Sequence, residues 1–412
     1  MRIINALIRT ALITSVLLPW NAPATDHLDF NGNLGANKFS ANYIEGLLVK
    51  SLFDVTQGKL QEALDTIDQL LKTAPNFKLA YLVRGDLLMA RAQQLQSFGD
   101  APAGLQETKS QQAMIEDFRE EARSRIERYL SQQVANSIPE PLWQLDSSQQ
   151  YVIVVDTEKS RLYVYRNEAG KPSYIADYYV TLGKNVGEKT AEGDKRTPLG
   201  VYFTNGKLSK KLPDFYGDAA YPLSYPNEWD SHQGKRGHGI WLHGTPSTTY
   251  SRPPRASDGC VVMTNPDLKS LANILQNGRV PVIISSNLKW LSTNQNSTEK
   301  EELTQSLEQW RQDWQAQDTD NYLAHYSSQF FTQSADLTTW AKEKRRIQAS
   351  KPKVEIRLSN ISMFRYPNNQ TQMAVVSFDQ DYKGNNLDSR IRKRQYWMLE
   401  NQRWKIIYEG PA

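Results

Sequence analysis

Residues 238–265 read HGIWLHGTPSTTYSRPPRASDGCVVMTN and hold the only cysteine of the chain, Cys260, together with two of its five histidines. A thiol attacks carbonyl carbon well only as the thiolate, and a neighbouring imidazole is the usual base that forms one. His243 precedes Cys260 by 17 residues, which is far enough for a loop to bring the two side chains together. The segment therefore predicts a cysteine-nucleophile enzyme in which Cys260 attacks and His243 is the base.

The first residues of the chain have the pattern of a secretory signal peptide. Positive charge at Arg2 and Arg9 precedes an apolar run over residues 11–18, and residues 22–24 have the small-residue cleavage pattern Ala-Pro-Ala. The apolar run is too short to span a bilayer comfortably. We therefore predict that residues 1–24 are a signal peptide and that the protein is exported to a bacterial periplasm. An uncleaved anchor is the alternative.

Export makes the single cysteine informative. Exported proteins use cysteines mainly in pairs, as disulfides, and an unpaired thiol is at risk of oxidation. A buried, inert thiol is the structural alternative, since cysteine packs as a small hydrophobic residue. Gly259 and the preceding Ser257-Asp258 pair are typical of a turn. This context argues against a core position for Cys260 and favours a reactive thiol.

The composition is that of a globular protein, with 39% hydrophobic and 23% charged residues. A length of 412 residues predicts two or three domains, at ~100–200 residues each. A net charge of +4 over this length is too small to predict nucleic-acid binding. The weak basic excess fits an anionic polymer as partner, and it fits a random distribution of surface charge equally well.

Residues 25–136 are predicted to form a helical domain. Gly58, Ala63 and Pro75 lie where a tetratricopeptide helix-turn-helix unit has its small residues and its terminal proline, so the region resembles one such repeat. One repeat cannot bury its own apolar face. Two interpretations stay open, a groove that docks a peptide or protein and a helical scaffold for the next domain. The apolar residues that recur at helical steps of three and four are Leu47, Leu48, Leu52, Leu60, Leu64, Ile67 and Leu71.

Two polar segments, residues 137–150 and residues 287–300, are predicted to be linkers because they are rich in turn-forming residues. Between them, residues 151–155 form a short apolar run typical of a buried strand, and residues 161–166 alternate like its hairpin partner. We therefore expect a second domain over residues 151–286 that opens as an all-β unit.

The C-terminal part, residues 301–412, is predicted to be an α+β domain, which makes the whole chain a multidomain α+β protein. Leu303, Leu307, Trp310 and Trp314 share one helical face, and four strand-like segments follow, separated by Asn- and Gly-rich turns. Helices followed by a curved antiparallel sheet resemble the nuclear-transport-factor-like cone fold. We interpret the aromatic stripe as core, with a substrate-gripping accessory domain as the alternative.

Three segments also resemble a known family. Residues 240–244 (Ile-Trp-Leu-His-Gly), residues 257–263 (Ser-Asp-Gly-Cys-Val-Val-Met) and residues 196–202 (Arg-Thr-Pro-Leu-Gly-Val-Tyr) are similar to motifs of the L,D-transpeptidase catalytic domain, also called the YkuD domain. The resemblance implies a β-sandwich over residues 151–286, with the cysteine loop at one edge.

The resemblance implies that the carbonyl of Gly244 orients the His243 imidazole. The amides of Gly259 and Cys260 are natural donors to an oxyanion, because glycine allows an exposed turn. The remaining candidate residues are Ser257 and Asp258, which would shape the site, and Arg252, Arg255 and Trp241, which would bind substrate.

The family acts on the stem peptides of peptidoglycan, so the resemblance implies these as the partner. The thiolate would attack the carbonyl of the third residue, a diamino acid, and expel a terminal D-alanine, after which an amine or water would take the acyl group. Arg252 and Arg255 could hold a stem-peptide carboxylate through two-pronged contacts, or they could be solvated surface residues. Other cell-wall proteins are conceivable partners of the helical or the C-terminal domain.

Two positions depart from the motif of many family members. Asp258 stands where those members have histidine, and Val262 stands where they have arginine. Without the arginine, a positive charge near the thiolate or the substrate is missing, which favours the variant branch whose members trim stem peptides or release attached lipoproteins. The order of helices, catalytic domain and cone-like domain also resembles that of cell-shape-determining L,D-carboxypeptidases. The first hypothesis is a peptidoglycan L,D-transpeptidase. The alternatives are an L,D-carboxypeptidase, a non-catalytic cell-wall scaffold and a papain-like protease.

No metal or other cofactor is predicted. The histidines are scattered along the chain, and the carboxylates do not show the spacing of metal ligands.

Overall fold

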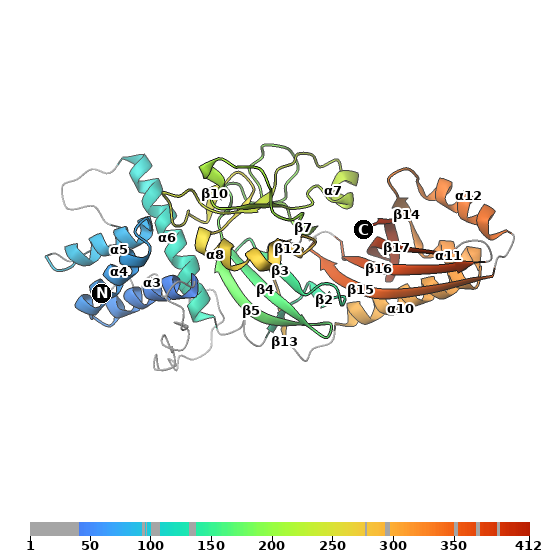
Figure 1. The fold of residues 1–412 in the computed structure, drawn as a ribbon, viewed down its shortest axis with the longest axis horizontal. Coiled ribbons are helices and arrows are strands. Elements are labelled where there is room, and N and C mark those ends of the chain that lie inside the picture. Colours follow the sequence, from blue (N-terminus) through green and yellow to red (C-terminus); the bar gives the residue numbers. More distant parts are fainter. Residues whose placement is uncertain are drawn as a thin grey trace.

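The computed structural model describes residues 41–92, 95, 97–99, 108–131, 137–276, 278–292, 297–349, 353–367, 371–384 and 388–412. The predicted signal peptide, residues 1–24, lies outside the described residues. Three regions follow one another along the long axis of the molecule: N-terminal helices, a central domain and a C-terminal domain of helices and sheet (Figure 1). This arrangement confirms the predicted multidomain α+β architecture.

The helices of the N-terminal region are α3 (Ala41–Thr56), α4 (Leu60–Thr73), α5 (Lys78–Met89) and α6 (Lys109–Leu130). The apolar faces predicted from the sequence meet in one core, which includes Leu47, Leu64 and Ile67. Gly58 has a φ of +77° in the turn between α3 and α4, a conformation that glycine adopts without steric cost. The same core also takes in Tyr250 from the central domain.

The central domain is a sandwich of sheets with one apolar core between them. One sheet has the strand order β5-β4-β3-β12-β7. Ile153 and Val164 in this sheet belong to the same buried cluster as Leu242 and Val261 in the facing sheet. The hairpin expected from the sequence is β3 paired with β4. The strands are β3 (Tyr151–Asp156), β4 (Arg161–Glu168), β5 (Lys171–Tyr179), β7 (Gly200–Phe203) and β12 (Pro281–Ser285).

The facing sheet has the order β11-β9-β8, with a smaller β10-β6 pair beside it. β9 and β11 run parallel, with Leu242 opposite Val261 and His243 opposite Val262. The chain that leaves the end of β9 therefore returns to the side of the sheet where β9 begins before it enters β11. These strands are β6 (Leu182–Gly183), β8 (Ala220–Pro222), β9 (Trp241–His243), β10 (Arg255–Ser257) and β11 (Val261–Val262).

Short helices connect these strands: η2 (Asp214–Tyr216), α7 (Glu228–His232), α8 (Asn265–Ser270) and α9 (Ala272–Leu275). The sequence predicts a helix over residues 266–275 with Asn265 as its cap. The structure instead has Thr264 as the N-cap of α8, and its side chain accepts a hydrogen bond from the Asp267 amide. Asn265 is thereby left to make the contacts described below.

The C-terminal domain packs its helices against a six-stranded sheet with the order β14-β18-β17-β16-β15-β2. The predicted helical face of Leu303, Leu307, Trp310 and Trp314 is buried, so the aromatic stripe is core. The four expected strands are β15 to β18. The elements are α10 (Thr298–Gln315), α11 (Thr319–Ala324), β14 (Tyr326–Phe331), α12 (Leu337–Gln348), β15 (Val354–Tyr366), β16 (Met373–Gly384), β17 (Asp388–Glu400) and β18 (Arg403–Pro411).

The segments expected to be linkers contain short strands. β1 (Ser137–Pro139) pairs with β13 (Trp290–Ser292), and β2 (Leu142–Gln144) adds to the C-terminal sheet beside β15. Leu142 shares one buried cluster with Tyr163 of the central domain and Tyr396 of the C-terminal domain. A continuous apolar core therefore joins these two domains.

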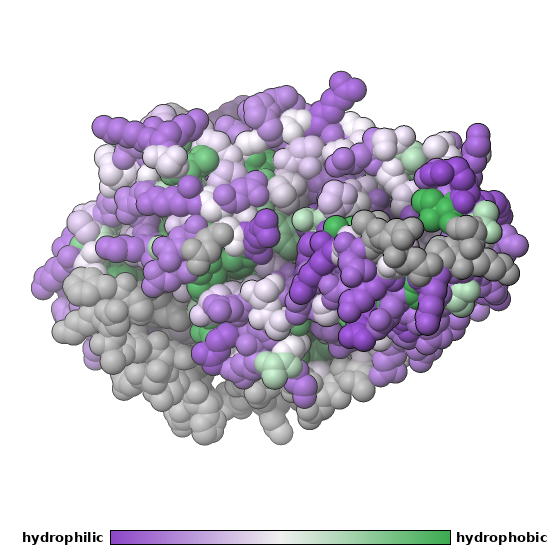
Figure 2. Space-filling view, turned by 45° about the vertical axis from the view of Figure 1, so that its right-hand side comes forward, coloured by the Kyte–Doolittle hydropathy of each residue, from purple (hydrophilic) through white to green (hydrophobic). Residues whose placement is uncertain are grey.

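The surface seen in Figure 2 is mostly hydrophilic, with hydrophobic side chains in small, separate patches. The exposed large hydrophobic side chains include Tyr81 on α5, Val186 and Phe215. Within the part of the chain that the structure describes, no helix has both the length and the apolar character needed to cross a membrane.

Candidate active site

Cys260 lies directly before β11, beside the strand that carries the predicted base. Val261 pairs with Leu242 and Val262 pairs with His243, so Cys260 is at the level of Trp241. His243 is two positions further along, or roughly 7 Å in the strand direction. The strand register therefore places the candidate nucleophile and the candidate base on adjacent strands, two residue positions apart along the strand direction.

The Cys260 thiol is hydrogen-bonded to backbone groups. Its Sγ donates to the Gly239 carbonyl at 3.3 Å and accepts from the Trp241 amide at 3.4 Å. Burial raises the pKa of the thiol, while the Trp241 amide and the positive charge of Arg252 oppose this rise. The residue is nevertheless partly exposed. At rest Cys260 is therefore a neutral thiol that a substrate can reach.

His243 is buried, with 1% of its surface exposed, and a backbone carbonyl fixes its tautomer. Its Nδ1 lies 2.7 Å from the oxygen of Gly244. A carbonyl oxygen only accepts, so Nδ1 carries the proton of the neutral ring and Nε2 keeps a lone pair. Burial lowers the pKa of His243 to about 4, and hydrogen bonds to the backbone of Gly244 and Tyr216 oppose the shift. The imidazole is therefore neutral at pH 7 and can accept a proton.

Aromatic side chains surround this imidazole. The rings of Phe215 and Tyr216, both on η2, have their centroids 6.2 Å and 5.2 Å from that of His243. Trp241 packs on Tyr216 at 4.9 Å. Phe215 is 48% exposed. The segment between β7 and β8 thus supplies an aromatic wall beside the base, and Trp241, a predicted substrate-binding residue, is part of it.

Asn265 supports the turn after His243, a role that was not predicted from the sequence. Its Nδ2 donates to the Thr245 carbonyl at 2.8 Å, and its Oδ1 accepts from the Asp218 amide at 3.1 Å. A Cβ atom on Gly244 would overlap this Oδ1, so only glycine fits there. The only signal for Asn265 was its position before a helix, where a cap was the simpler interpretation.

Ser257 and Gly259 form the turn that leads into the thiol. Ser257 Oγ donates to the Cys260 carbonyl at 2.7 Å and accepts from the Gly259 amide at 3.1 Å. Gly259 has a φ of +125°, and a Cβ atom there would meet the Arg196 carbonyl at 2.8 Å. The Gly259 amide, one of the two expected oxyanion donors, is thus already engaged. The Cys260 amide remains as the other expected donor.

Arg252 is close enough to Cys260 for its positive charge to act on the thiol. Its guanidinium sits over the Phe215 ring at 5.3 Å, donates to the Ala256 carbonyl and interacts electrostatically with Cys260. Its Nη1 is buried and has no hydrogen-bond partner among the described residues. A buried donor without an acceptor costs free energy, so this atom is suited to bind an acceptor from a ligand.

Two other predicted residues are directed elsewhere. Arg255 donates to the carbonyl of Thr157, the residue that directly follows β3. Asp258 is exposed and forms an ion pair with Lys184 at 3.0 Å. The structure therefore does not bring the guanidinium of Arg255 or the carboxylate of Asp258 into contact with the thiol.

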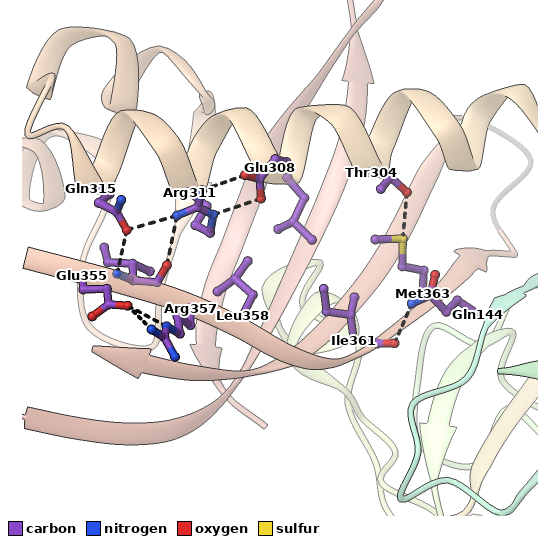
Figure 3. A pocket seen from close by; sticks show the side chains of 12 residues that line it. Gln144, Thr304, Glu308, Arg311, Gln315, Glu355, Arg357, Leu358, Ile361 and Met363 are labelled. Carbon is purple, nitrogen blue, oxygen red and sulfur yellow. Dashed lines mark hydrogen bonds and ion pairs between the residues drawn. The ribbon is translucent and has the colours of Figure 1, made fainter. Parts of the chain in front are cut away.

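Pockets occur in or beside the C-terminal domain. One of about 540 Å³ lies between α10 and β15, where Arg311 donates to the Ile356 carbonyl and Gln315 accepts from the Ile356 amide (Figure 3). Another of about 500 Å³ lies between α7 and the C-terminal sheet and is lined in part by His232 and Arg394. Among the described residues, no group of three His, Cys, Asp or Glu side chains is arranged to hold a metal ion.

The β-sandwich that carries Cys260 and His243 corresponds to a known catalytic domain. Residues 150–284 match the model of the L,D-transpeptidase catalytic domain, YkuD, and residues 302–410 match that of the Cds6 C-terminal NTF2-like domain. The chain thus contains an L,D-transpeptidase catalytic domain followed by an NTF2-like domain, as its motifs and strand pattern predicted.

Two solved structures resemble this chain over most of their own length. A point mutant of the helical cell shape determining protein Pgp2 from Campylobacter jejuni is 27% identical with a TM-score of 0.57, over 68% of this chain and 94% of Pgp2. Bd1075 from Bdellovibrio bacteriovorus is 28% identical with a TM-score of 0.58, over 67% of this chain and 99% of Bd1075. No curated protein gives a significant match.

Proposed function

We propose that this protein is a peptidoglycan-modifying enzyme that acts on stem tetrapeptides through a thioester on Cys260. One arrangement supports the proposal most directly. A partly exposed thiol lies at the start of β11, and the strand beside it ends in a buried imidazole whose tautomer is fixed by the Gly244 carbonyl. The proposal includes export to the periplasm, where peptidoglycan lies.

The acylation step follows from these groups. The thiol turns from the Gly239 carbonyl toward His243, and Nε2 takes its proton as the sulfur attacks the carbonyl carbon of the third stem residue. The oxyanion that forms accepts from the Cys260 amide. When the tetrahedral intermediate collapses, the peptide bond breaks and the imidazolium protonates the leaving amine. D-alanine departs, and the remaining tripeptide is held as a thioester.

An acceptor then resolves the thioester. His243 takes a proton from the acceptor as it attacks, and returns a proton to the departing sulfur. An amine of a second stem peptide gives a 3-3 cross-link, and the match to the L,D-transpeptidase domain makes this the first candidate. Water gives a trimmed tripeptide. Two observations favour this second candidate: Val262 replaces the family arginine, and a protein named for helical cell shape is similar over 94% of its length.

Arg252 is proposed to hold a carboxylate of the stem peptide. Its Nη1 is buried and has no partner among the described residues, and its guanidinium interacts electrostatically with Cys260. A guanidinium–carboxylate bond would satisfy this donor, which is otherwise left without an acceptor. Arg255 is not assigned this role, because its guanidinium is bonded to the Thr157 carbonyl.

The decisive experiment incubates the protein with purified disaccharide tetrapeptide, with and without an acceptor stem peptide, and analyses the products by mass. Tripeptide alone indicates hydrolysis, and a cross-linked dimer indicates transpeptidation. Cys260→Ala should lose both products while keeping the melting temperature of the wild type, because this side chain is not in the core. A fully active Cys260→Ala variant would rule out the thioester. A wild type that forms neither product would favour the non-catalytic scaffold.

A further inference from the structure

The N-terminal helices hold the chain that follows β9. Asn76, which comes after α4, donates from Nδ2 to the Ser247 carbonyl at 3.0 Å, and its own carbonyl accepts from the Tyr250 amide at 3.2 Å. Ser251 Oγ donates to Glu121 on α6 at 2.6 Å. Hydrogen bonds thus connect the helical region to three residues of one loop, Ser247, Tyr250 and Ser251.

Burial of Tyr250 anchors the same loop, which we call the support loop and define as residues 245–254. The Tyr250 ring is 8% exposed, belongs to the core of the helical region and contacts the Phe77 ring at 4.7 Å. Burying an apolar side chain of this size contributes roughly 1.5–3 kcal/mol. The helical region therefore fixes the support loop by packing as well as by hydrogen bonds.

Arg252 is the loop residue that comes directly after these anchors. Its carbonyl accepts from the hydroxyl of Tyr179 at 3.0 Å and from that of Thr181 at 2.8 Å. The guanidinium of Arg125, on α6, lies over the Tyr179 ring at 4.0 Å. The backbone of Arg252 is thus held by the anchored loop residues before it and by the hydroxyls of Tyr179 and Thr181. The positive charge of its guanidinium acts on Cys260.

We propose that the N-terminal helices position Arg252 beside Cys260 through the support loop. Asn76 and Glu121 are then positioning residues, since they contact the loop and not the thiol. Figure 1 shows α6 lying along the central domain near β10, as this role requires. The inference rests on the proposed function in one respect, namely that the ligand of Arg252 is a stem-peptide carboxylate. The effect of Arg252 on the thiol does not depend on any substrate.

The single cysteine allows a test without substrate. Iodoacetamide alkylates thiolate, so the dependence of its rate on pH reports the ionisation of Cys260 alone. Arg252→Gln removes a charge that favours the thiolate and should slow alkylation about two-fold or more near pH 8. The double variant Asn76→Ala/Ser251→Ala should slow it in the same direction, because the loop no longer holds the guanidinium in place. The charged side chains that act on the sulfur are Arg252, Asp258 and Lys189.

Arg84→Ala is the matched control. It removes an exposed ion pair with Asp68 on the same helices, and its alkylation profile should superimpose on that of the wild type. Melting temperatures establish that every variant is folded. The proposal is overturned if the double variant superimposes on the wild type while Arg252→Gln is shifted. It is equally overturned if Arg252→Gln leaves the profile unchanged.

Turnover of the tetrapeptide separates this inference from the proposed function. If both hold, the double variant should raise KM more than it lowers kcat, because the carboxylate contact is loosened and the Cys–His pair is intact. A wild type without turnover, combined with the expected alkylation shifts, would reject the proposed function and leave the positioning of Arg252 in place. Turnover that stays normal in a double variant with an unshifted profile would reject the positioning alone.

Discussion

Cys260 and His243 are both neutral near pH 7 in this protein. Burial raises the pKa of the Cys260 thiol and lowers that of the His243 imidazole to about 4. A preformed thiolate–imidazolium pair would require both shifts to run the other way. In the proposed mechanism, proton transfer would therefore accompany the attack on the carbonyl, with the neutral imidazole as general base.

The first prediction concerns the pH dependence of this thiol. We expect the alkylation rate of Cys260 to keep rising through the alkaline range, about ten-fold for each pH unit below its pKa. His243 stays neutral above pH 4 or so and adds no step between about pH 5 and 7. The measurement is the rate of alkylation by iodoacetamide from about pH 5 into the alkaline range. A plateau that begins near pH 6 would demonstrate an ion pair and contradict the prediction.

A second prediction concerns the glycine after the base. Gly244→Ala should destabilise the protein by about 1–3 kcal/mol, because the added methyl group overlaps the Asn265 carboxamide, and should lower activity by moving the carbonyl that orients His243. Chemical unfolding and turnover measure the two effects. Gly85→Ala is the control, since the space around this α5 residue is open, and it should be neutral or stabilising by up to about 1 kcal/mol. Equal losses in both variants would contradict the argument.

Buried charges join α6 to the central domain. Arg125 on α6 pairs with Glu45 at 2.9 Å and with Glu121 at 2.9 Å, while Arg161 on β4 pairs with Glu45 at 2.7 Å and with Asp177. All five side chains are buried. Removing one member of such a group leaves an unpaired charge in the interior, which is far more costly than losing a surface pair.

Arg161→Met should therefore lower the free energy of unfolding by about 3–5 kcal/mol at pH 7. Burial by itself would raise the pKa of Asp177, but Arg161 and Arg128 hold it at about 2. The stabilisation is thus present above the unfolded pKa of about 4 and is lost as the pH falls toward 2. Urea unfolding at pH 7 and pH 3 should show a deficit that shrinks at the lower pH.

The exposed pair of Arg84 and Asp68 supplies the control for this measurement. Arg84→Met should cost less than about 1 kcal/mol, with little dependence on pH. A deficit for Arg161→Met that is as small as that of the control, or that does not change with pH, would mean that the buried pairs do not stabilise the contact between α6 and the central domain.

At the level of the complete chain, the central and C-terminal domains depend on one another. Leu142, Tyr163, Tyr165 and Tyr396 belong to one buried cluster that crosses between them. Deleting residues 297–412 would expose this cluster. We expect the truncated protein to be largely insoluble, whereas deleting residues 1–136 should leave a soluble product, since Tyr250 is the one central-domain residue that the helical core takes in among those the structure describes. Comparable solubility of the two truncations would contradict a shared core.

Local patterns predicted most of the fold. The helical face from Leu303 to Trp314 and the alternation in residues 161–166 are properties of short segments, and both elements formed as expected. The pairing of β2 with β15 joins residues more than two hundred positions apart. The composition of residues 137–150 does not predict a strand partner so distant in sequence. Proline and polar residues indicate a break in regular structure, but they do not indicate which strand the segment pairs with.

The candidate site was predictable to a similar degree. The motif residues Cys260 and His243 belong to adjacent strands, β11 with its preceding turn and β9, and Gly244 accepts from the His243 ring. Arg252 and Arg255 could not be told apart, since they share a loop and a residue type. Only tertiary contacts direct the guanidinium of Arg252 to the Phe215 ring and that of Arg255 to the Thr157 carbonyl. The role of Asn265 depends on the folded turn around Gly244 in the same way.

β2 has a consequence for how such proteins can be recombined. Its three residues precede the catalytic domain in the chain, yet they border the sheet of the last domain. A chimera joined near residue 295 would receive the C-terminal sheet of another protein but would keep β2, the edge strand that pairs with the original sheet. An exchange that preserves the sheet would have to transfer β2 together with the C-terminal domain. The polar segment before residue 300 is therefore not a sufficient boundary for such an exchange.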